Sequence, residues 1–337
     1  MDIPSLNGPW QLAEVGKRKS IPAVVPGDVV HDLYTAGEIP DPFYRDNEDN
    51  VRWIGETDWL YRKTFTADPA LMAKQRVVLR CEGLDTLATV TLNGKKVGTT
   101  DNMFRMWEFD IKKAIKKGTN SIEIVFNSPN RYIRKRQKET GCLLSHGGPR
   151  EVSGRGWIRK EPSNFGWDWG ICLVTSGIWR DISIVSYDVA RITDVAIEQD
   201  HTESGRVSVS ASISTDVAGT SALTATMALV FKGKSVAQAS ATLLQGKGRI
   251  TIDVAKPQMW WPNNLGEQNL YECVVKLSSE KRVIDTWQNR IGLRTLRLDR
   301  HADQWGESFQ FVINRSEERR VGKECESECR SRWSPYH

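Results

Sequence analysis

Short stretches with alternating hydrophobic and polar residues, separated by turn signals, constrain this chain most. Alternation with a period of two predicts strands that are buried on one face. Asn93-Gly94 lies between two such runs and is typical of a tight hairpin turn. The strand candidates of this first part are Trp59–Phe65, Arg76–Cys81, Ala88–Leu92, Ser121–Phe126 and Ile178–Val185. Gly27–Gly37 instead predicts a short helix capped by Asp28. Residues 1–187 are therefore expected to form an all-β sandwich of jelly-roll type.

The composition changes near Asp188, where Trp becomes rare and Ser, Thr, Val and Ala dominate. About seven short strands over about 105 residues are typical of an immunoglobulin-like sandwich. The strand candidates of this second part are Val195–Glu198, Val207–Ile213, Leu223–Val230, Arg249–Val254, Tyr271–Leu277 and Val283–Ile291. Residues 188–296 are expected to form that domain, although the Cys…Trp…Cys pattern of antibody domains is missing.

A glycine-rich segment, Thr140–Gly170, interrupts the first domain. Its glycine density excludes a regular element, and long ordered loops in compact domains are usually functional. The chain also has 13 Trp residues, eight of them before residue 180. The flat apolar face and single N–H donor of Trp suit the apolar faces of sugar rings, although sandwich cores use Trp as well.

Several function classes are disfavoured by the sequence. The net charge is only +5, and the densest basic stretch, Arg131–Lys138, is interpreted as a solvated surface segment, so no nucleic-acid partner is expected. The six Cys residues are scattered without the spacing of a metal site or a disulfide framework. No apolar run reaches the roughly 18 residues of a membrane span. No signal peptide is recognisable at Met1, which favours a cytoplasmic location.

Three groups of motifs resemble the β-mannosidases of glycoside hydrolase family 2. The first group is Val25–Asp28, Asp32-Leu33, Gly37, Ile39–Glu48, Trp53–Gly55 and Asp58–Arg62. The second is Ile158–Lys160, Asn164–Gly170 and Gly177–Asp181. The third, shared by the wider family, is Trp260–Asn263, Gly266, Asn269–Tyr271 and Arg290–Thr295. The resemblance extends from residue 3 to about residue 314, and the first group favours the mannosidase branch over an exo-glucosaminidase.

The resemblance implies an enzyme that removes terminal non-reducing β-D-mannose with retention and acts on β-mannosides or mannose-containing oligosaccharides. The sequence has no phosphate loop or metal motif, so no cofactor or metal is expected. In the family, both catalytic glutamates lie on a (β/α)8 barrel that follows the immunoglobulin-like domain. Residues 297–314 would begin that barrel, so no catalytic residue is assigned here and the fragment is expected to be inactive alone. The resemblance further implies that Asp168 binds mannose hydroxyls between walls formed by Trp167 and Trp169. Arg159 and Lys160 would support that loop.

Besides another sugar specificity within the family, such as that of an exo-glucosaminidase, two alternatives remain open at this stage. The glycine-rich segment 140–170, which carries Trp167 and Trp169 and is also called the Trp-rich loop below, could instead serve only to pack two domains together. Asp168 would then pair with Arg159. The whole chain could also be a stand-alone carbohydrate-binding protein made of two β-sandwiches. Residues 315–337 have dense mixed charge, two Cys residues and no apolar periodicity, so we interpret this tail as an artefact foreign to the fold.

Overall fold

The structure is a computed structural model that describes residues 4–148, 150–167, 169–202, 205–304, 306–314 and 320–321. The chain divides into two compact units, Met1–Asp188 and Val189–His337. Each unit is described here by itself. Among the described residues, no helix is long and apolar enough to cross a membrane.

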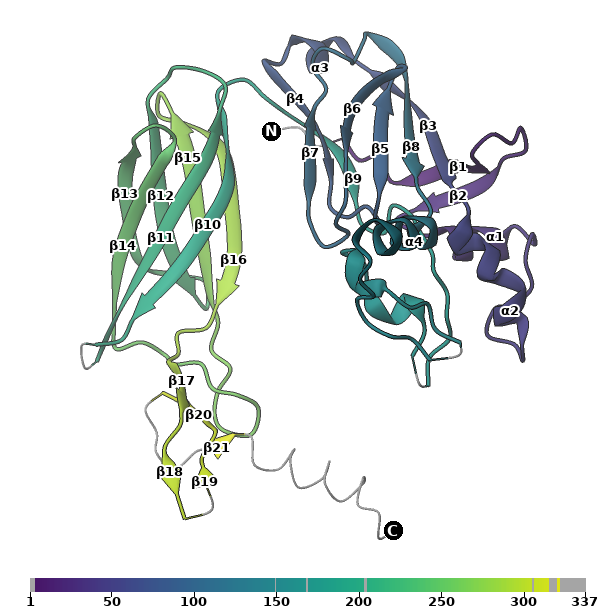
Figure 1. The fold of residues 1–337 in the computed structure, drawn as a ribbon. Helices are drawn as coiled ribbons and strands as arrows, with labels where there is room; N and C mark the ends of the chain where they lie inside the picture. The colour runs from purple at the N-terminus through teal and green to yellow at the C-terminus, as the bar shows by residue number, and fades with distance from the viewer. Residues whose placement is uncertain are drawn as a thin grey trace. The chain divides into compact units, whose positions relative to one another are not determined.

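The first unit is a sandwich of two antiparallel sheets (Figure 1). The larger sheet has the order β2-β1-β3-β8-β5-β6, and its strands are β1 (Gly8–Glu14), β2 (Ile21–Val25), β3 (Trp59–Ala67), β5 (Ala88–Leu92), β6 (Lys95–Thr99) and β8 (Gly118–Phe126). The smaller sheet has the order β7-β4-β9, and its strands are β4 (Arg76–Cys81), β7 (Trp107–Asp110) and β9 (Ile182–Tyr187). The side chains of Ile122, Ile124 and Phe126 alternate along β8 and are fully buried, as period-two burial requires.

Helices occupy the connections of this sandwich. They are α1 (Val29–Thr35), α2 (Asn47–Val51), α3 (Pro69–Ala73) and α4 (Pro129–Thr140), with 3-10 turns η1 (Arg52–Glu56), η2 (Arg155–Trp157) and η3 (Pro162–Phe165). Figure 1 shows α1, α2 and α4 at one end of the strands, and the segment after α4 extends from the same end. This end of the sandwich therefore carries both the helix predicted over Gly27–Gly37 and the glycine-rich segment.

The second unit is also a sandwich of antiparallel sheets. One sheet has the order β10-β11-β14, with β10 (Ala190–Asp200), β11 (Arg206–Val217) and β14 (Lys247–Ala255). The other has the order β13-β12-β15-β16, with β12 (Leu223–Phe231), β13 (Lys234–Leu243), β15 (Tyr271–Ser279) and β16 (Arg282–Ile291). Val209, Met227 and Val275 are fully buried in its core. These seven strands, counted over the described part of the chain, match the expected immunoglobulin-like architecture.

Smaller strands follow this sandwich. They are β17 (Leu296–Asp299), β18 (Ala302–Asp303), β19 (Gly306–Glu307), β20 (Gln310–Ile313) and β21 (Arg320–Val321). Strand β20 pairs with β17, and the side-chain N–H of Asn314 donates to Trp260 O at 2.9 Å.

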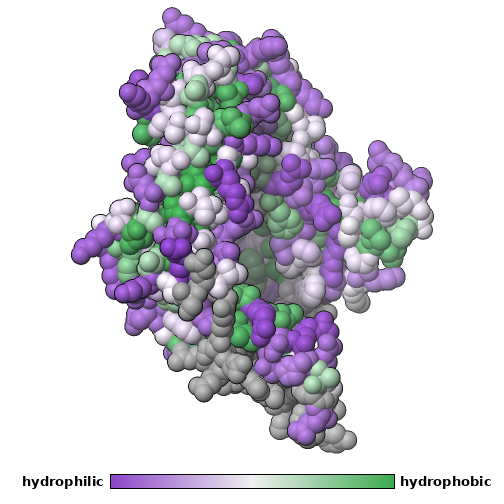
Figure 2. All heavy atoms as spheres, turned by 90° about the vertical axis from the view of Figure 1, so that its left-hand side faces the viewer, coloured by the Kyte–Doolittle hydropathy of each residue, from purple (hydrophilic) through white to green (hydrophobic). Residues whose placement is uncertain are grey.

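Figure 2 shows small hydrophobic groups separated by hydrophilic residues on the visible face of the molecule.

Several elements differ from the sequence expectation. Strand β9 begins at Ile182, because residues 178–181 form a loop whose backbone pairs with other segments. Strands β1, β2, β7 and β13 were not predicted. The basic stretch Arg131–Lys138 belongs to helix α4, and most of its charged side chains are exposed. Most of the tail 315–337 lies outside the described residues.

Candidate functional site

The glycine-rich segment is held by a small hydrophobic core of its own. Helix α4 ends where Gly141 adopts a left-handed conformation, at φ 65°, and its N–H donates to Gln137 O at 2.9 Å. The chain then folds back, and its later residues pack in one small core with a buried residue of α4. The buried members of this core are Ile133, Ile158, Phe165, Cys172 and Val174. Apart from the short turns η2 and η3 the segment is irregular, as its glycine content predicts.

Arg155 connects several parts of this loop. Its Nη1 atom donates to the Glu151 carboxylate at 2.9 Å and to Gly166 O at 3.1 Å. The guanidinium carbon also lies 5.1 Å from the centre of the Trp167 ring. Both members of the Arg155–Glu151 pair are largely buried, so the contact is shielded from solvent. Arg155 thus fixes the backbone of Gly166 and supports the ring of Trp167.

Close packing at Gly166 leaves little room for a side chain. Its φ is +93°, and a Cβ atom would lie 3.0 Å from Glu151 Cγ and 3.3 Å from Cys172 Cβ. Glycine is therefore favoured here by the backbone conformation, and a larger residue would also require these neighbours to shift. Gly166 immediately precedes Trp167 in the chain. The same packing therefore helps to set the backbone position of Trp167.

Trp167 and Trp169 form an exposed aromatic pair. Trp167 N donates to Gly170 O at 3.3 Å, and Gly170 N donates back to Trp167 O at 3.1 Å. The two ring centres are 5.9 Å apart with an interplanar angle of 69°. Trp167 is 41% exposed and Trp169 is 80% exposed. Large apolar faces open to solvent are typical of a contact surface rather than of a sandwich core. Asp168 lies outside the described residues.

Lys160 and Arg159 have different surroundings. The Lys160 ammonium forms a buried ion pair with the Asp85 carboxylate. Asp85 also accepts from the Thr86 hydroxyl, and its backbone N–H donates to Gly177 O at 2.9 Å. Arg159 is exposed and contributes its backbone, since its carbonyl accepts from Met103 N at 3.0 Å. Lys160 therefore anchors the second half of the glycine-rich segment to the sandwich, whereas the Arg159 side chain faces solvent.

The carboxylates of the first motif group support the fold. The Asp28 carboxylate caps helix α1 by accepting from Val30 N at 2.9 Å, and it also accepts from the Thr175 hydroxyl at 2.7 Å. Asp32 is buried and accepts from Tyr61 Oη at 2.8 Å. Burial raises the pKa of the Asp32 carboxyl, and burial beside Asp32 raises the pKa of the Tyr61 hydroxyl well above its usual value.

The first and second motif groups meet in space. Gly27 N donates to Ile178 O at 2.9 Å, and Val29 N donates to Ser176 O at 2.9 Å. A Cβ atom on Gly177 would lie 2.6 Å from Gly27 O, which is closer than real side chains approach. The backbones of the two motif groups therefore pack directly against each other.

The third motif group packs together within the second unit. Trp260 N donates to Leu293 O at 2.9 Å, and the Arg294 guanidinium lies 4.4 Å from the centre of the Trp260 ring. A Cβ atom on Gly292 would lie 2.7 Å from the same ring. These residues close one end of the immunoglobulin-like sandwich.

Sequence reasoning placed the two Trp residues on the loop but did not identify what holds them. Arg155 and Glu151 were not selected as site residues. Their separation of four residues is a usable signal only on a helix, and here the intervening backbone is irregular. The Asp85–Lys160 pair likewise joins positions 75 residues apart, a separation without a sequence signature.

Comparison with known proteins adds to this geometry. Residues 10–180 match the glycosyl hydrolase 2 galactose-binding domain-like family, and residues 190–294 match glycosyl hydrolases family 2. Beta-mannosidase B from Emericella nidulans is 34% identical over 90% of this chain and 37% of its own length. Beta-mannosidase B from Aspergillus oryzae is 36% identical over 86% of this chain and 34% of its own length.

Solved structures agree with these matches. A β-D-mannosidase from Dictyoglomus thermophilum is 35% identical, with a TM-score of 0.88 over 94% of this chain and 39% of that chain. An exo-chitosanase from Amycolatopsis orientalis is 18% identical, with a TM-score of 0.68 over 94% of this chain and 36% of that chain, and this likeness shows the fold alone. The chain spans about a third of the length of the curated relatives it matches. On these matches, the chain belongs to glycoside hydrolase family 2.

Proposed function

We propose that this chain is the non-catalytic front part of a retaining exo-β-mannosidase, which removes terminal non-reducing β-D-mannose from β-mannosides or mannose-containing oligosaccharides. Support comes from relatives and a solved neighbour named as β-mannosidases, at 34–36% identity over most of the chain. We assign no catalytic residue within residues 1–337, and we expect the chain alone to be inactive.

The observation that carries the proposal is the exposed aromatic pair on an anchored loop. Trp167 and Trp169 present large faces to solvent, and such faces can cover the C–H side of a pyranose ring. Asp168 stands between them in the sequence, and a carboxylate can accept two hydroxyl hydrogen bonds that its charge strengthens. We propose that Asp168 binds hydroxyls of the terminal mannose and that both Trp residues form walls beside the sugar. Lys160 and Arg159 would support the loop.

The reaction itself would take place on a domain beyond this chain. A retaining glycosidase uses two carboxyl groups about 5–5.5 Å apart, one as nucleophile and one as general acid and base. We propose that residues 297–314 lead into that domain. The β17–β20 pair carries exposed apolar side chains, with Leu296 58% and Phe311 40% exposed, and Phe309, just before β20, is 64% exposed. A following domain that packed here would remove these faces from water.

Hydrolysis of an aryl β-mannoside tests the proposal. The 337-residue chain is compared with a version extended by the remainder of its own gene to the length of its relatives. We expect hydrolysis only in the extended version. Hydrolysis by the 337-residue chain would contradict the placement of the catalytic carboxylates outside it. Binding of mannose oligosaccharides with no hydrolysis in either version would instead favour a stand-alone carbohydrate-binding protein.

The loop is tested in the extended version. Asp168→Ala removes a charged hydrogen-bond acceptor, a loss of roughly 1.5–3 kcal/mol, or about 10- to 150-fold in kcat/KM. Trp169→Ala should also lower kcat/KM, because it removes one wall. Phe43→Ala is a matched control, since Phe43 is 74% exposed against 80% for Trp169 and lies outside the loop. Unchanged kcat/KM in Asp168→Ala would show that this loop does not bind the sugar.

A further inference from the structure

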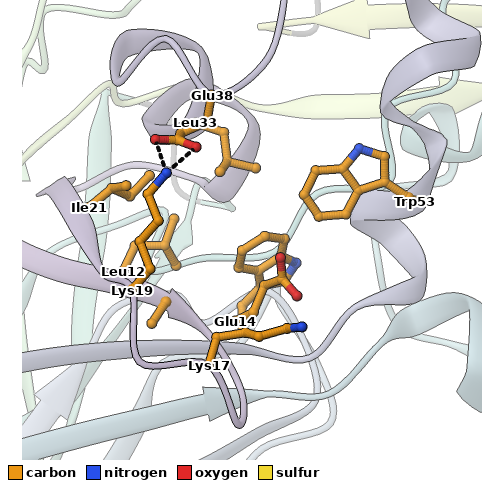
Figure 3. A pocket seen from close by; sticks show the side chains of 10 residues that line it. Leu12, Glu14, Lys17, Lys19, Ile21, Leu33, Glu38 and Trp53 are labelled. Carbon is orange, nitrogen blue, oxygen red and sulfur yellow. Dashed lines mark hydrogen bonds and ion pairs between the residues drawn. The ribbon is translucent and has the colours of Figure 1, made fainter.

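A separate cavity of about 350 Å³ opens on the first unit, within the size range of small-ligand sites (Figure 3). It lies between the β1–β2 hairpin, the end of helix α1 and the turn η1. Its apolar lining comes from Leu12, Ile21, Leu33 and Trp59. No residue that lines it belongs to the Trp-rich loop 140–170.

Two Trp residues line this cavity, and they differ in what they offer a ligand. Trp59 is 2% exposed, and its indole N–H donates to Ile54 O at 3.0 Å. Trp53 is 39% exposed, and its indole N–H has no hydrogen-bond partner among the described residues. The ring centres are 5.7 Å apart at an interplanar angle of 46°, so the buried ring supports the exposed one. Trp53 thus presents an aromatic face and an unused donor.

The charged groups around the cavity are balanced. Lys19 and Glu38 form an ion pair at 2.7 Å across one side, as the dashed lines in Figure 3 show. Glu14 and Lys17 line the cavity as well, and their charged groups have no side-chain partner among the described residues. Two carboxylates and two ammonium groups sum to zero, so the site does not favour an anion or a cation. A neutral ligand with both an apolar face and hydroxyl groups fits this set.

We propose that this cavity is a non-catalytic binding site for one hexopyranose unit of a β-linked mannan chain. The C–H face of the sugar would stack on Trp53, a hydroxyl would donate to Glu14, and Lys17 would donate to a ring or hydroxyl oxygen. The choice of mannan rests on the proposed β-mannosidase function, whereas the choice of a neutral sugar rests on the cavity itself. Such a site would hold the polymer on the protein apart from the Trp-rich loop.

Isothermal titration calorimetry of the 337-residue chain with mannohexaose tests this proposal, with cellohexaose as the comparison sugar. We expect a dissociation constant on the order of 1 mM for mannohexaose. Trp53→Ala should weaken binding by about tenfold or more, and Glu14→Gln by a smaller factor. Phe104→Ala is the control for losing an exposed aromatic ring, since Phe104 is 57% exposed and does not line the cavity. Trp53→Phe keeps an aromatic face and should bind better than Trp53→Ala, which guards against misfolding as the cause.

The outcomes separate the possibilities. No heat of binding for either sugar, or unchanged affinity in Trp53→Ala, would overturn the site. Loss of binding in Trp169→Ala but not in Trp53→Ala would overturn it too, because the sugar would then occupy the Trp-rich loop. Binding of cellohexaose alone would overturn the mannan assignment while keeping the cavity. Because the calorimetry needs no catalysis, a failure of the proposed β-mannosidase activity is detected separately, by aryl β-mannoside hydrolysis.

Discussion

Replacing Lys160 with Met should strongly destabilise the first unit, because the substitution leaves a buried carboxylate without its counter-ion. The side chain of Lys160 is 0% exposed and that of Asp85 is 4% exposed, so water cannot solvate either charge. Removing one partner of a buried pair typically costs about 3–5 kcal/mol. Met fills a volume similar to that of the Lys stem, so most of the loss would come from the stranded charge rather than from a cavity.

A surface pair in the same unit provides the matched control. Lys19 and Glu38 form an ion pair at 2.7 Å, but their side chains are 71% and 34% exposed. Exposed pairs of this kind contribute roughly 0–1 kcal/mol, because water screens them and holding two long side chains costs entropy. Lys19→Met should therefore change the free energy of unfolding by no more than about 1 kcal/mol. The double variant Lys160→Met with Asp85→Leu should recover much of the loss, since it removes both charges.

The assay has to report on the first unit alone, because a chain of two units need not unfold in one step. Hydrogen exchange of peptides from β3 and β8, followed by mass spectrometry in increasing urea, gives the free energy of unfolding of that sandwich. An equal and small effect of Lys160→Met and Lys19→Met would refute the reasoning. It would mean that water solvates the Asp85 charge at little cost when its partner is lost.

Two further predictions concern the packing of the first unit. Gly177→Ala should destabilise this unit by about 1–3 kcal/mol, because the new Cβ would lie 2.6 Å from Gly27 O and the backbone must shift. Thermal unfolding of this variant that matches wild type would contradict the prediction. Asp32 has a pKa raised above 3.8 by burial, so its contribution to stability is present below that pH and is lost as the pH rises through the raised value. In urea titrations, the free energy of unfolding of wild type minus that of Asp32→Asn should therefore fall as the pH rises above about 3.8. A difference that grows with pH would count against the assignment.

The strands that the sequence predicted best are those with clear turns on both sides. The bounds of β4 and β5 agree with the predicted runs, and the hairpin from β5 to β6 turns at Asn93-Gly94. Strand β13 was missed because Lys234–Leu243 consists mainly of Ser, Ala and Gln with few large apolar residues, so its alternation is weak. Its strand conformation depends on pairing with β12, which a local pattern does not contain.

Helix α4 was missed although its ends carry recognisable signals. Ser128 caps the helix by accepting from Arg131 N at 3.1 Å, Pro129 occupies the first turn, and Gly141 ends it. The interior is strongly basic and buries few apolar side chains, Ile133 among them, so the periodicity that normally identifies a helix is faint. The capping residues were the better signal here, and tertiary contacts through Ile133 supply what the periodicity lacks.

The motifs that identified the family act mainly through packing, and this explains both their specificity and their limits. A Cβ atom on Gly177 would lie 2.6 Å from Gly27 O, and a Cβ atom on Gly27 would clash with the backbone oxygen of Val24, so neither position tolerates a larger residue without a backbone shift. Gly177 pairs through its backbone with Asp85, and Asp85 forms an ion pair with Lys160, which precedes Trp167 in the Trp-rich loop. Because each contact in this path joins distant parts of the sequence, no local pattern could reveal it. A substitution at Gly27 should therefore disturb the Trp-rich loop indirectly. If it lowered the proposed β-mannosidase activity, that loss would report on support of the proposed site and not on direct contact with a sugar.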